Sequence, residues 1–345
     1  MATNVNTIRD GQTRPYCRLR EEETSSFNTN QTSSLRNQIL EIANNPSTVK
    51  WIKNIRREIH EYPELAYEEF KTSSVIRREL DNLGVGYEWP VAKTAEERGV
   101  GAKDMIKENV LDDVEAVFGL HLATQYPLGV VASRPGDFLA GCGSFKAKIK
   151  GDLARIPHHC LDPILAASAS VISLQNIVSR EVDPLDSQVV SVAMIRAVPG
   201  HELIPDSVTF GGTYRAFGKK SFNALRQRIE EVIKAQVEVH RCSAEVDFIG
   251  KEHPTIPPTT NDERIYQLAK QASSMIVGEE NIKLAQTFTA SEDYAFFLEK
   301  VPGTLFLLGC GSIYSAHSSH FFIDEDVLPI GAAIHAAFAL SYHSL

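Results

Sequence analysis

GSFKAKIKG, residues 143–151, opens the part of the chain that decides the fold. It is predicted to be a strand, and the chain after it alternates between helical and extended patterns. The segments that follow are a helix at 162–180, strands at 188–197 and 207–217, a helix at 221–241 and a strand at 244–250. The order β-α-β-β-α-β predicts a ferredoxin-like arrangement. We therefore expect a complete small domain, inserted in a larger one.

The chain has to rejoin the larger domain after this insertion. The segment PTIPPTTND, residues 254–262, contains three prolines and is expected to be a stiff hinge. The polar N-terminal segment offers little apolar surface to offset the entropy of ordering. We expect four parts: a disordered N-terminal segment at 1–33, the first part of the larger domain at 34–135, the inserted domain at 136–255 and the second part of the larger domain at 256–345.

The larger domain is predicted to be α/β. Its clearest strand is the apolar run VEAVFGLHL, residues 114–122, which is typical of a strand buried on both faces of a parallel sheet. Functional residues in such sheets lie at the carboxyl ends of strands, which is where this run places His121. The other expected elements are helices at 51–59, 75–83, 102–110 and 291–300, helices beginning at Asp262 and Asp326, and strands at 85–89 and 304–309.

Composition and charge exclude several classes of function. The 345 residues are 43% hydrophobic, enough for two packed domains, and carry a formal net charge of −9. No run of lysine or arginine is longer than a pair, so no nucleic-acid partner is expected. No apolar stretch reaches about 18 residues, so no membrane partner is expected. Without a secretory leader, the chain as written is expected to be cytoplasmic.

The five cysteines are widely spread and include no Cys-x-x-Cys pair, so we expect reduced thiols. Cys142 lies between two glycines, a pattern that indicates close packing of small residues and not a nucleophilic thiol. Cys160 with His158 is an alternative thiol site. Residues 291–293, Ser-Glu-Asp, are expected to be the N-cap and first-turn acids of a helix. His320, three residues after His317, is an alternative second metal ligand, but we do not expect it to have this role.

Residues 94–99, TAEERG, contain two adjacent carboxylates, Glu96 and Glu97. Such a pair is most often the solvated start of a helix, where the helix dipole favours negative charge. However, His121 and His317 lie near the ends of predicted strands, and glutamate with histidine suits zinc, manganese or cobalt. One glutamate would then bind the cation, and the other would accept a proton from the attacking water. Both interpretations stay open on the residues alone.

Five motifs occur together in this chain: HEYPELAYEEF at 60–70, VFGLHL at 117–122, IPDSVTFGGTYRAF at 204–217, SEDYAFF at 291–297 and AHSSHFFIDEDVLPIGAAIHAA at 316–337. Together they resemble the plant auxin-conjugate amidohydrolases. That family belongs to the aminoacylase and carboxypeptidase type of metallohydrolase, and the resemblance runs from about residue 34 to the end. It implies a discontinuous α/β catalytic domain with a mostly parallel sheet, incomplete here. The inserted ferredoxin-like domain would be its α+β lid or dimerisation domain.

The resemblance also implies roles for individual residues. Glu96 corresponds to the general base, and Glu97, His121 and His317 correspond to metal ligands. Arg215 corresponds to a residue that faces the substrate from the inserted domain. The implied reaction hydrolyses the amide bond of a small-molecule auxin–amino acid conjugate. The family further implies a location in the endoplasmic reticulum, and we expect a homodimer through the inserted domain.

One segment of the family pattern is missing. Relatives carry an Asp-x-Asp motif and a Cys-Gly-His-Asp motif before the glutamates, and both supply metal ligands. Here PVAKT, residues 90–94, passes directly to AEERG, residues 95–99. In the inserted domain, GDLAR at 151–155 replaces a Gly-Gly-His, and Glu202 replaces an asparagine. The family binds two metal ions, whereas the donors that remain here suffice for at most one, manganese or zinc.

Two hypotheses follow. The first is a metal-dependent amidohydrolase of the auxin-conjugate type with weak turnover. The second is a catalytically inactive shortened paralogue or splice form that dimerises or binds a ligand. Loss of central strands would leave their neighbours without backbone partners, at a cost of about 1–3 kcal/mol for each buried group.

Overall fold

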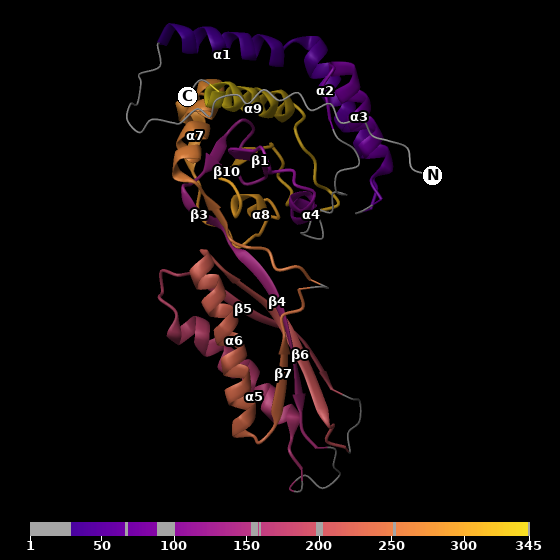
Figure 1. The fold of residues 1–345 in the computed structure, drawn as a ribbon, viewed down its shortest axis with the longest axis vertical. Helices are drawn as coiled ribbons and strands as arrows, with labels where there is room; N and C mark the ends of the chain where they lie inside the picture. Colours follow the sequence, from indigo (N-terminus) through magenta and orange to yellow (C-terminus); the bar gives the residue numbers. More distant parts are fainter. Residues whose placement is uncertain are drawn as a thin grey trace, which may run out of the picture.

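The computed structural model describes residues 29–65, 68–87, 101–152, 158, 160–197, 203–250 and 253–343. It consists of two bodies along one axis, as Figure 1 shows: the inserted domain at one end and the larger body at the other. The mixed α/β fold with an inserted domain is the predicted fold class. Glu96 and Glu97 lie outside the described residues.

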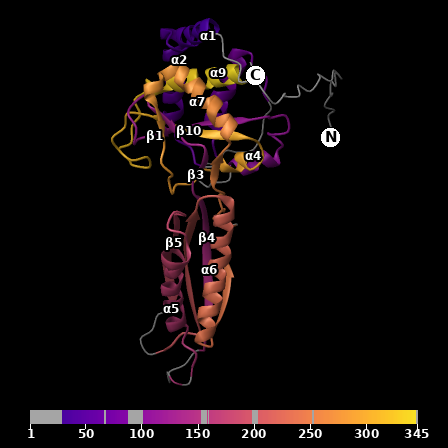
Figure 2. The ribbon, with the colours of Figure 1, turned by 90° about the vertical axis from the view of Figure 1, so that its left-hand side faces the viewer.

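The inserted domain has the predicted order of elements. Its strands are β4 (Gly141–Lys150), β5 (Gln188–Ala197), β6 (Ser207–Ala216) and β7 (Ser243–Asp247). They form an antiparallel sheet in the order β5-β6-β4-β7. Its helices are α5 (Pro163–Asn176), which continues into the π-helix η3 (Ile177–Glu181), and α6 (Lys219–Val239). Figures 1 and 2 show both helices on the same face of this sheet.

The sequence explains why these elements pack in this way. Asp162 caps α5, because its carboxylate accepts the backbone N–H groups of Ile164 and Leu165. Along β4, buried residues alternate with more exposed ones, so one face of the strand lies against the helices. On α6 the buried side chains recur at helical spacing and complete a core of their own: Phe222, Leu225, Ile229, Ile233 and Val237.

The larger body is built around a mixed sheet. Its strands are β1 (Val117–Ala123), β2 (Val131–Ser133), β9 (Ile282–Leu284) and β10 (Gly303–Gly309). The order is β1-β10-β2-β9, in which β1 runs parallel to β10 and β2 runs antiparallel to it. Phe306 and Leu308 of β10 pack in a second core with residues of three helices, α1 (Thr29–Ala43), α7 (Glu263–Val277) and α9 (Val327–His343).

Shorter elements surround this sheet. They are α2 (Pro46–Glu61), α3 (Phe70–Leu83), α4 (Gly101–Lys107), α8 (Ala295–Leu298) and the 3-10 helix η4 (Glu279–Asn281). As predicted, α3 ends at Gly84, which has a left-handed φ of 68°. The prediction of a strand at 85–89 is wrong for 85–87, which are irregular, and 88–89 lie outside the described residues. Helix α1 begins at Thr29, inside the segment expected to be disordered.

The predicted strand at 114–122 exists as β1, but its burial differs from the prediction. Six of its seven residues are only partly buried. The reason is its place in the sheet: among the described residues β1 pairs with β10 alone and is therefore an edge strand. An edge strand lacks the second neighbour that would bury both of its faces.

A two-stranded sheet lies where the chain enters and leaves the inserted domain. It pairs β3 (Gly136–Leu139) with β8 (Thr259–Asn261) in antiparallel fashion. The predicted hinge at 254–262 therefore ends in a strand. A Cβ on Gly141 would lie 2.8 Å from Cδ of Pro258, so this junction is tightly packed. In the described part of the chain, no helix combines the length and apolar character needed to cross a membrane.

Candidate active site

His121 lies near the carboxyl end of β1, as predicted. Its Nδ1 is 2.6 Å from the carbonyl oxygen of Leu122. A carbonyl oxygen only accepts hydrogen bonds, so Nδ1 donates to it. That Nε2 faces Oε1 of Glu292 at 3.5 Å, with side chains 42% and 27% exposed. His121 therefore places its second ring nitrogen beside a carboxylate that water can reach.

Residues 291–293, Ser-Glu-Asp, were expected to be the N-cap and first-turn acids of a helix, and that prediction is wrong. Helix α8 spans only Ala295–Leu298 and has no side-chain cap. Asp293 instead accepts the backbone N–H of Ala102 at 2.9 Å, at the start of α4. Tyr294 donates to the carbonyl oxygen of Thr304 at 3.2 Å, and burial raises its pKa above the ordinary value. These contacts fix the segment that carries Glu292.

His317 lies in the loop between β10 and α9. The backbone N–H of Cys310 donates to the carbonyl oxygen of Ala123 at 3.1 Å, and that of Asp324 donates to the carbonyl oxygen of Cys310 at 2.9 Å. The loop thus starts and ends beside the carboxyl end of β1. His317 is exposed and has a φ of 67°, the left-handed region that few non-glycine residues adopt. His320 is exposed too, and its ring centroid lies 5.7 Å from that of Tyr314.

Arg215 extends from the inserted domain to the larger body. It lies on β6, and its Nη1 donates to the carbonyl oxygen of Thr289 at 2.6 Å. Thr289 is three residues before Glu292, so the arginine contacts the loop that carries this carboxylate. A role for Arg215 at the site stays a prediction. Glu292 was missed because its partner, His121, is distant in the sequence and local pattern favoured a helix cap.

The described residues bring together two of the donor atoms that a metal site needs. Among the described residues, no three histidine, cysteine, aspartate or glutamate side chains form a group that could hold a metal ion. His121 and Glu292 nevertheless provide one imidazole nitrogen and one carboxylate oxygen that face each other, a set suited to zinc or manganese. The predicted ligand Glu97 lies outside the described residues. The predicted set of Glu97, His121 and His317 stays a prediction.

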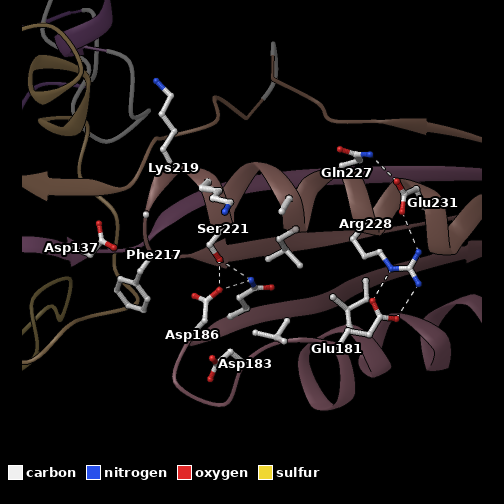
Figure 3. Close-up of a pocket in the computed structure, with 17 residues that line it drawn as sticks. Asp137, Glu181, Asp183, Asp186, Phe217, Lys219, Ser221, Gln227, Arg228 and Glu231 are labelled. Atoms are coloured by element: carbon white, nitrogen blue, oxygen red, sulfur yellow. Dashed lines mark hydrogen bonds and ion pairs between the residues drawn. The ribbon is translucent and has the colours of Figure 1, made fainter.

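A groove lies elsewhere, on the inserted domain (Figure 3). It has a volume of about 840 Å³ and lies between α6, η3 and the loop that follows η3. Its charged groups are largely paired: Arg228 bonds to Glu181 at 2.7 Å and to Glu231 at 3.1 Å. Asp186 accepts from Ser221 at 2.6 Å. The lining includes none of His121, Arg215 or His317, so we place the chemistry at β1 instead.

The thiol alternative is remote from β1. Cys160 and His158 lie between the end of β4 and the start of α5. Figure 1 shows this end of the inserted domain pointing away from the larger body. Close packing was the preferred interpretation of Gly141-Cys142-Gly143. A Cβ on Gly143 would lie 2.2 Å from Cζ of Tyr214, so this position has no room for a larger residue, in agreement with that interpretation.

Comparison with known sequences identifies the family. Residues 90–341 match the model of peptidase family M20/M25/M40. The chain is 38% identical to IAA-amino acid hydrolase ILR1-like 4 of Arabidopsis thaliana, over 92% of this chain and 91% of that protein. The alignment has 401 positions, whereas the chain has 345 residues, so at least 56 positions fall opposite gaps in this chain. These gaps agree with a missing internal segment.

Solved structures have the same fold. A protein from methicillin-resistant Staphylococcus aureus superposes with a TM-score of 0.81 at 21% identity, over 89% of this chain and 99% of that one. YxeP of Bacillus subtilis, a dinuclear metal-binding peptidase from family M20, superposes with a TM-score of 0.74 at 21% identity, over 86% and 98%. Sequence and fold thus agree that this chain, a hydrolase of the amidohydrolase type, belongs to peptidase family M20/M25/M40.

Proposed function

We propose that this chain hydrolyses the amide bond of auxin–amino acid conjugates, with a single divalent cation and at a lower rate than its full-length relatives. The identity to an IAA-amino acid hydrolase over 92% of the chain supports the substrate class. One observation supports the position of the site. Nε2 of His121 lies 3.5 Å from Oε1 of Glu292, and the loop that contains His317 starts and ends beside the same end of β1.

The residues of the chain have separate tasks in this proposal. Glu97, His121 and His317 hold the cation, which is manganese or zinc. When bound, the cation supplies Lewis-acid polarisation of the scissile carbonyl. Glu96 accepts the proton of the attacking water and returns it to the leaving amine. Arg215, which already spans the two bodies, binds the carboxylate of the amino-acid part.

The lower rate follows from the missing segment. At least 56 positions of the relative have no counterpart in this chain, and β1 is left as an edge strand.

The first prediction concerns Glu96. Purified chain with Mn²⁺ or Zn²⁺ should release indole-3-acetic acid from its alanine and leucine conjugates, and Glu96→Gln should lower the rate by about 10²-fold or more. Release is measured by liquid chromatography with mass spectrometry. Equal rates for wild type and Glu96→Gln would contradict the proposal.

The same observations favour a second candidate, a shortened chain that binds ligand or dimerises without catalysis. The inserted domain retains its full set of elements, and the strands at the edges of its sheet are β5 and β7. An exposed sheet edge can pair with a second copy. A homodimer through this domain would elute at twice the mass of 38.2 kDa in size-exclusion chromatography with light scattering. A dimer with neither metal nor product would favour this candidate over the hydrolase.

A further inference from the structure

We propose that Cys160 and Cys242 form a reversible disulfide when the protein meets a disulfide oxidant such as glutathione disulfide. Both side chains are thiols in this structure. They lie where β4 ends and where α5 and β7 begin. Figure 1 shows this end of the inserted domain pointing away from the larger body. The proposed disulfide is therefore separate from the site at β1 and does not depend on the proposed function.

The backbone brings the two cysteines to the same place. In the antiparallel pair of β4 and β7, Lys150 lies opposite Ser243. One step beyond this pair lie Gly151 on one strand and Cys242 on the other. A Cβ on Gly151 would lie 2.3 Å from the carbonyl oxygen of Leu161, the residue that directly follows Cys160. Gly151 thus has Cys242 on one side and the neighbour of Cys160 on the other.

A hydrogen bond holds this arrangement. The backbone N–H of Asp152 donates to the carbonyl oxygen of Leu161 at 3.0 Å, so the segment before α5 continues the pairing along β4 where β7 begins. Leu161 also packs against the core of the inserted domain, and Cys242 is a member of that core. Gly151 has no side chain that could separate the two segments.

The electrostatics of Cys242 are the second argument. Burial raises the pKa of its thiol, and the carboxylates of Asp162 and Asp152 raise it further. Arg241 lowers this pKa, whereas Cys160 raises it. The influence of one charged group on another fades with distance, so an effect of Cys160 on Cys242 agrees with the closeness that the backbone pairing gives.

The two thiols differ in access to solvent, which sets the order of the steps. Cys160 is half-buried, whereas Cys242 is 7% exposed. The Cys160 thiolate attacks one sulfur of glutathione disulfide, and one reduced glutathione leaves. The Cys242 thiolate then attacks the sulfur of Cys160 and displaces the second glutathione. Two protein thiols thus lose two electrons and two protons, and one glutathione disulfide becomes two molecules of reduced glutathione.

The disulfide would change the stability of the inserted domain. It would join the segment before α5 to the start of β7, about 80 residues further along the chain. A cross-link over so long a loop lowers the entropy of the unfolded chain and so stabilises the folded one. The stability of this domain then depends on the redox potential of the surroundings.

Two other cysteines serve as internal controls. Cys142 lies at the opposite end of β4, where its backbone N–H donates to the carbonyl oxygen of Ile256 at 2.9 Å. Cys310 is fully buried in a core of the larger body. Neither is near the proposed disulfide, so both should remain thiols under the same oxidation.

The second prediction is tested by oxidising the reduced full chain with glutathione disulfide and mapping its peptides by mass spectrometry without reduction. We expect one cross-linked pair of peptides, which contains Cys160 and Cys242, and we expect dithiothreitol to restore both thiols. The oxidised chain should also unfold at a midpoint about 5 °C higher in calorimetry, because of the long loop that the bond closes.

Variants separate the disulfide from other effects of oxidation. Cys160→Ser and Cys242→Ala should each abolish both the cross-link and the rise in the midpoint. Cys310→Ala is the matched control for Cys242→Ala, since it also replaces a buried thiol, and it should keep both effects. If Cys242→Ala fails to fold, Cys160→Ser gives the same test at a half-buried position.

Several results would overturn the proposal. One is a chain in which Cys160 carries glutathione while Cys242 stays a thiol. Another is a disulfide from either residue to a different cysteine or to a second copy of the chain, which a non-reducing gel would reveal. An unchanged midpoint despite the cross-link would overturn the stabilising role. None of these readouts involves hydrolysis or metal binding, so a failure here leaves the proposed function unaffected.

Discussion

Asn261 joins the hinge strand β8 to the sheet of the larger body. Its side chain is 3% exposed. Nδ2 donates to the carbonyl oxygen of Arg134 at 2.7 Å, and Oδ1 accepts from the backbone N–H of Leu305 at 2.8 Å. Both backbone groups belong to segments that lie far from Asn261 in the sequence. A single amide therefore satisfies one backbone group just after β2 and one in β10, at the junction of the two bodies.

The third prediction is that Asn261→Ala destabilises the larger body by about 2 kcal/mol or more, because each buried backbone group left without a partner costs about 1–3 kcal/mol. Urea unfolding followed by fluorescence measures the change. Asn281→Ala is the control, since Asn281 is only half-buried and donates one hydrogen bond, to Val277 at 2.7 Å. A loss for Asn261→Ala no larger than that of the control would contradict the assignment.

Some residues at the site could be predicted from sequence and others could not. His121 was predicted because it follows an apolar run, and the end of such a run is the end of a strand. Glu292 and Asp293 were not, because Ser-Glu-Asp also fits a helix cap, and only the fold brings His121 and Ala102 to them. Contacts between distant segments leave no local signal in the sequence.

Among the helices, α2 has a structural role that its amphipathic pattern does not reveal. Glu325, just before α9, accepts hydrogen bonds from Arg56 at 3.2 Å and from Arg57 at 3.0 Å. Lys53 pairs with Asp326 at 2.6 Å. These bonds tie α2 to the point where the His317 loop ends. The helix therefore holds the base of a loop that carries a predicted metal ligand.

The fourth prediction is a pH-dependent loss of stability in Glu325→Gln. The hydrogen bond from Arg57, followed by the charges of Arg57 and Arg56, holds the pKa of Glu325 below its ordinary value of 4.5. A depressed pKa in the folded state adds stability above the unfolded pKa, and that stability is lost as the pH falls through the folded pKa. We expect Glu325→Gln to lower the thermal midpoint by about 2 °C at pH 7, and the difference from wild type to shrink as the pH falls through the folded pKa.

Differential scanning fluorimetry between pH 3 and about 8 measures this difference. Glu245→Gln is the control, because its pair with Lys150 is exposed and should add little stability. A constant difference between Glu325→Gln and wild type across the whole pH range would show that the carboxylate stabilises by packing and not by charge.

Helix α3 shows that the sequence predicts a helix more reliably than it predicts which side chains of that helix are buried. Its helical spacing and its glycine cap were both predicted. Yet only Val75 of this helix is buried, and Phe70, Ile76 and Leu83 are 67%, 47% and 59% exposed. Like the edge position of β1, this exposure agrees with the gaps in this chain relative to the longer relative.

At the scale of the whole molecule, the two bodies have separate cores. The core of the inserted domain includes Phe210 and Ile229, and a core of the larger body includes Phe306 and Ile334. Among the described residues, polar bonds between the bodies include Arg215 to Thr289 and Lys219 to Glu299. The order of elements in the inserted domain was predictable because its contacts follow a common pattern of neighbouring segments. The predicted boundaries at 136 and 255 stay a prediction.

The fifth prediction is that the two bodies unfold in separate transitions. Ile229 on α6 and Ile334 on α9 are both fully buried, each in a different core, so they form a matched pair. Replacement of either by alanine should cost about 2–5 kcal/mol, because it removes apolar contacts and leaves a cavity. With separate cores, Ile229→Ala should lower only the transition of the inserted domain, and Ile334→Ala only that of the larger body. Calorimetry measures the transitions, and hydrogen exchange assigns each one. One transition that both variants shift equally would mean that the hinge couples the bodies into one cooperative unit.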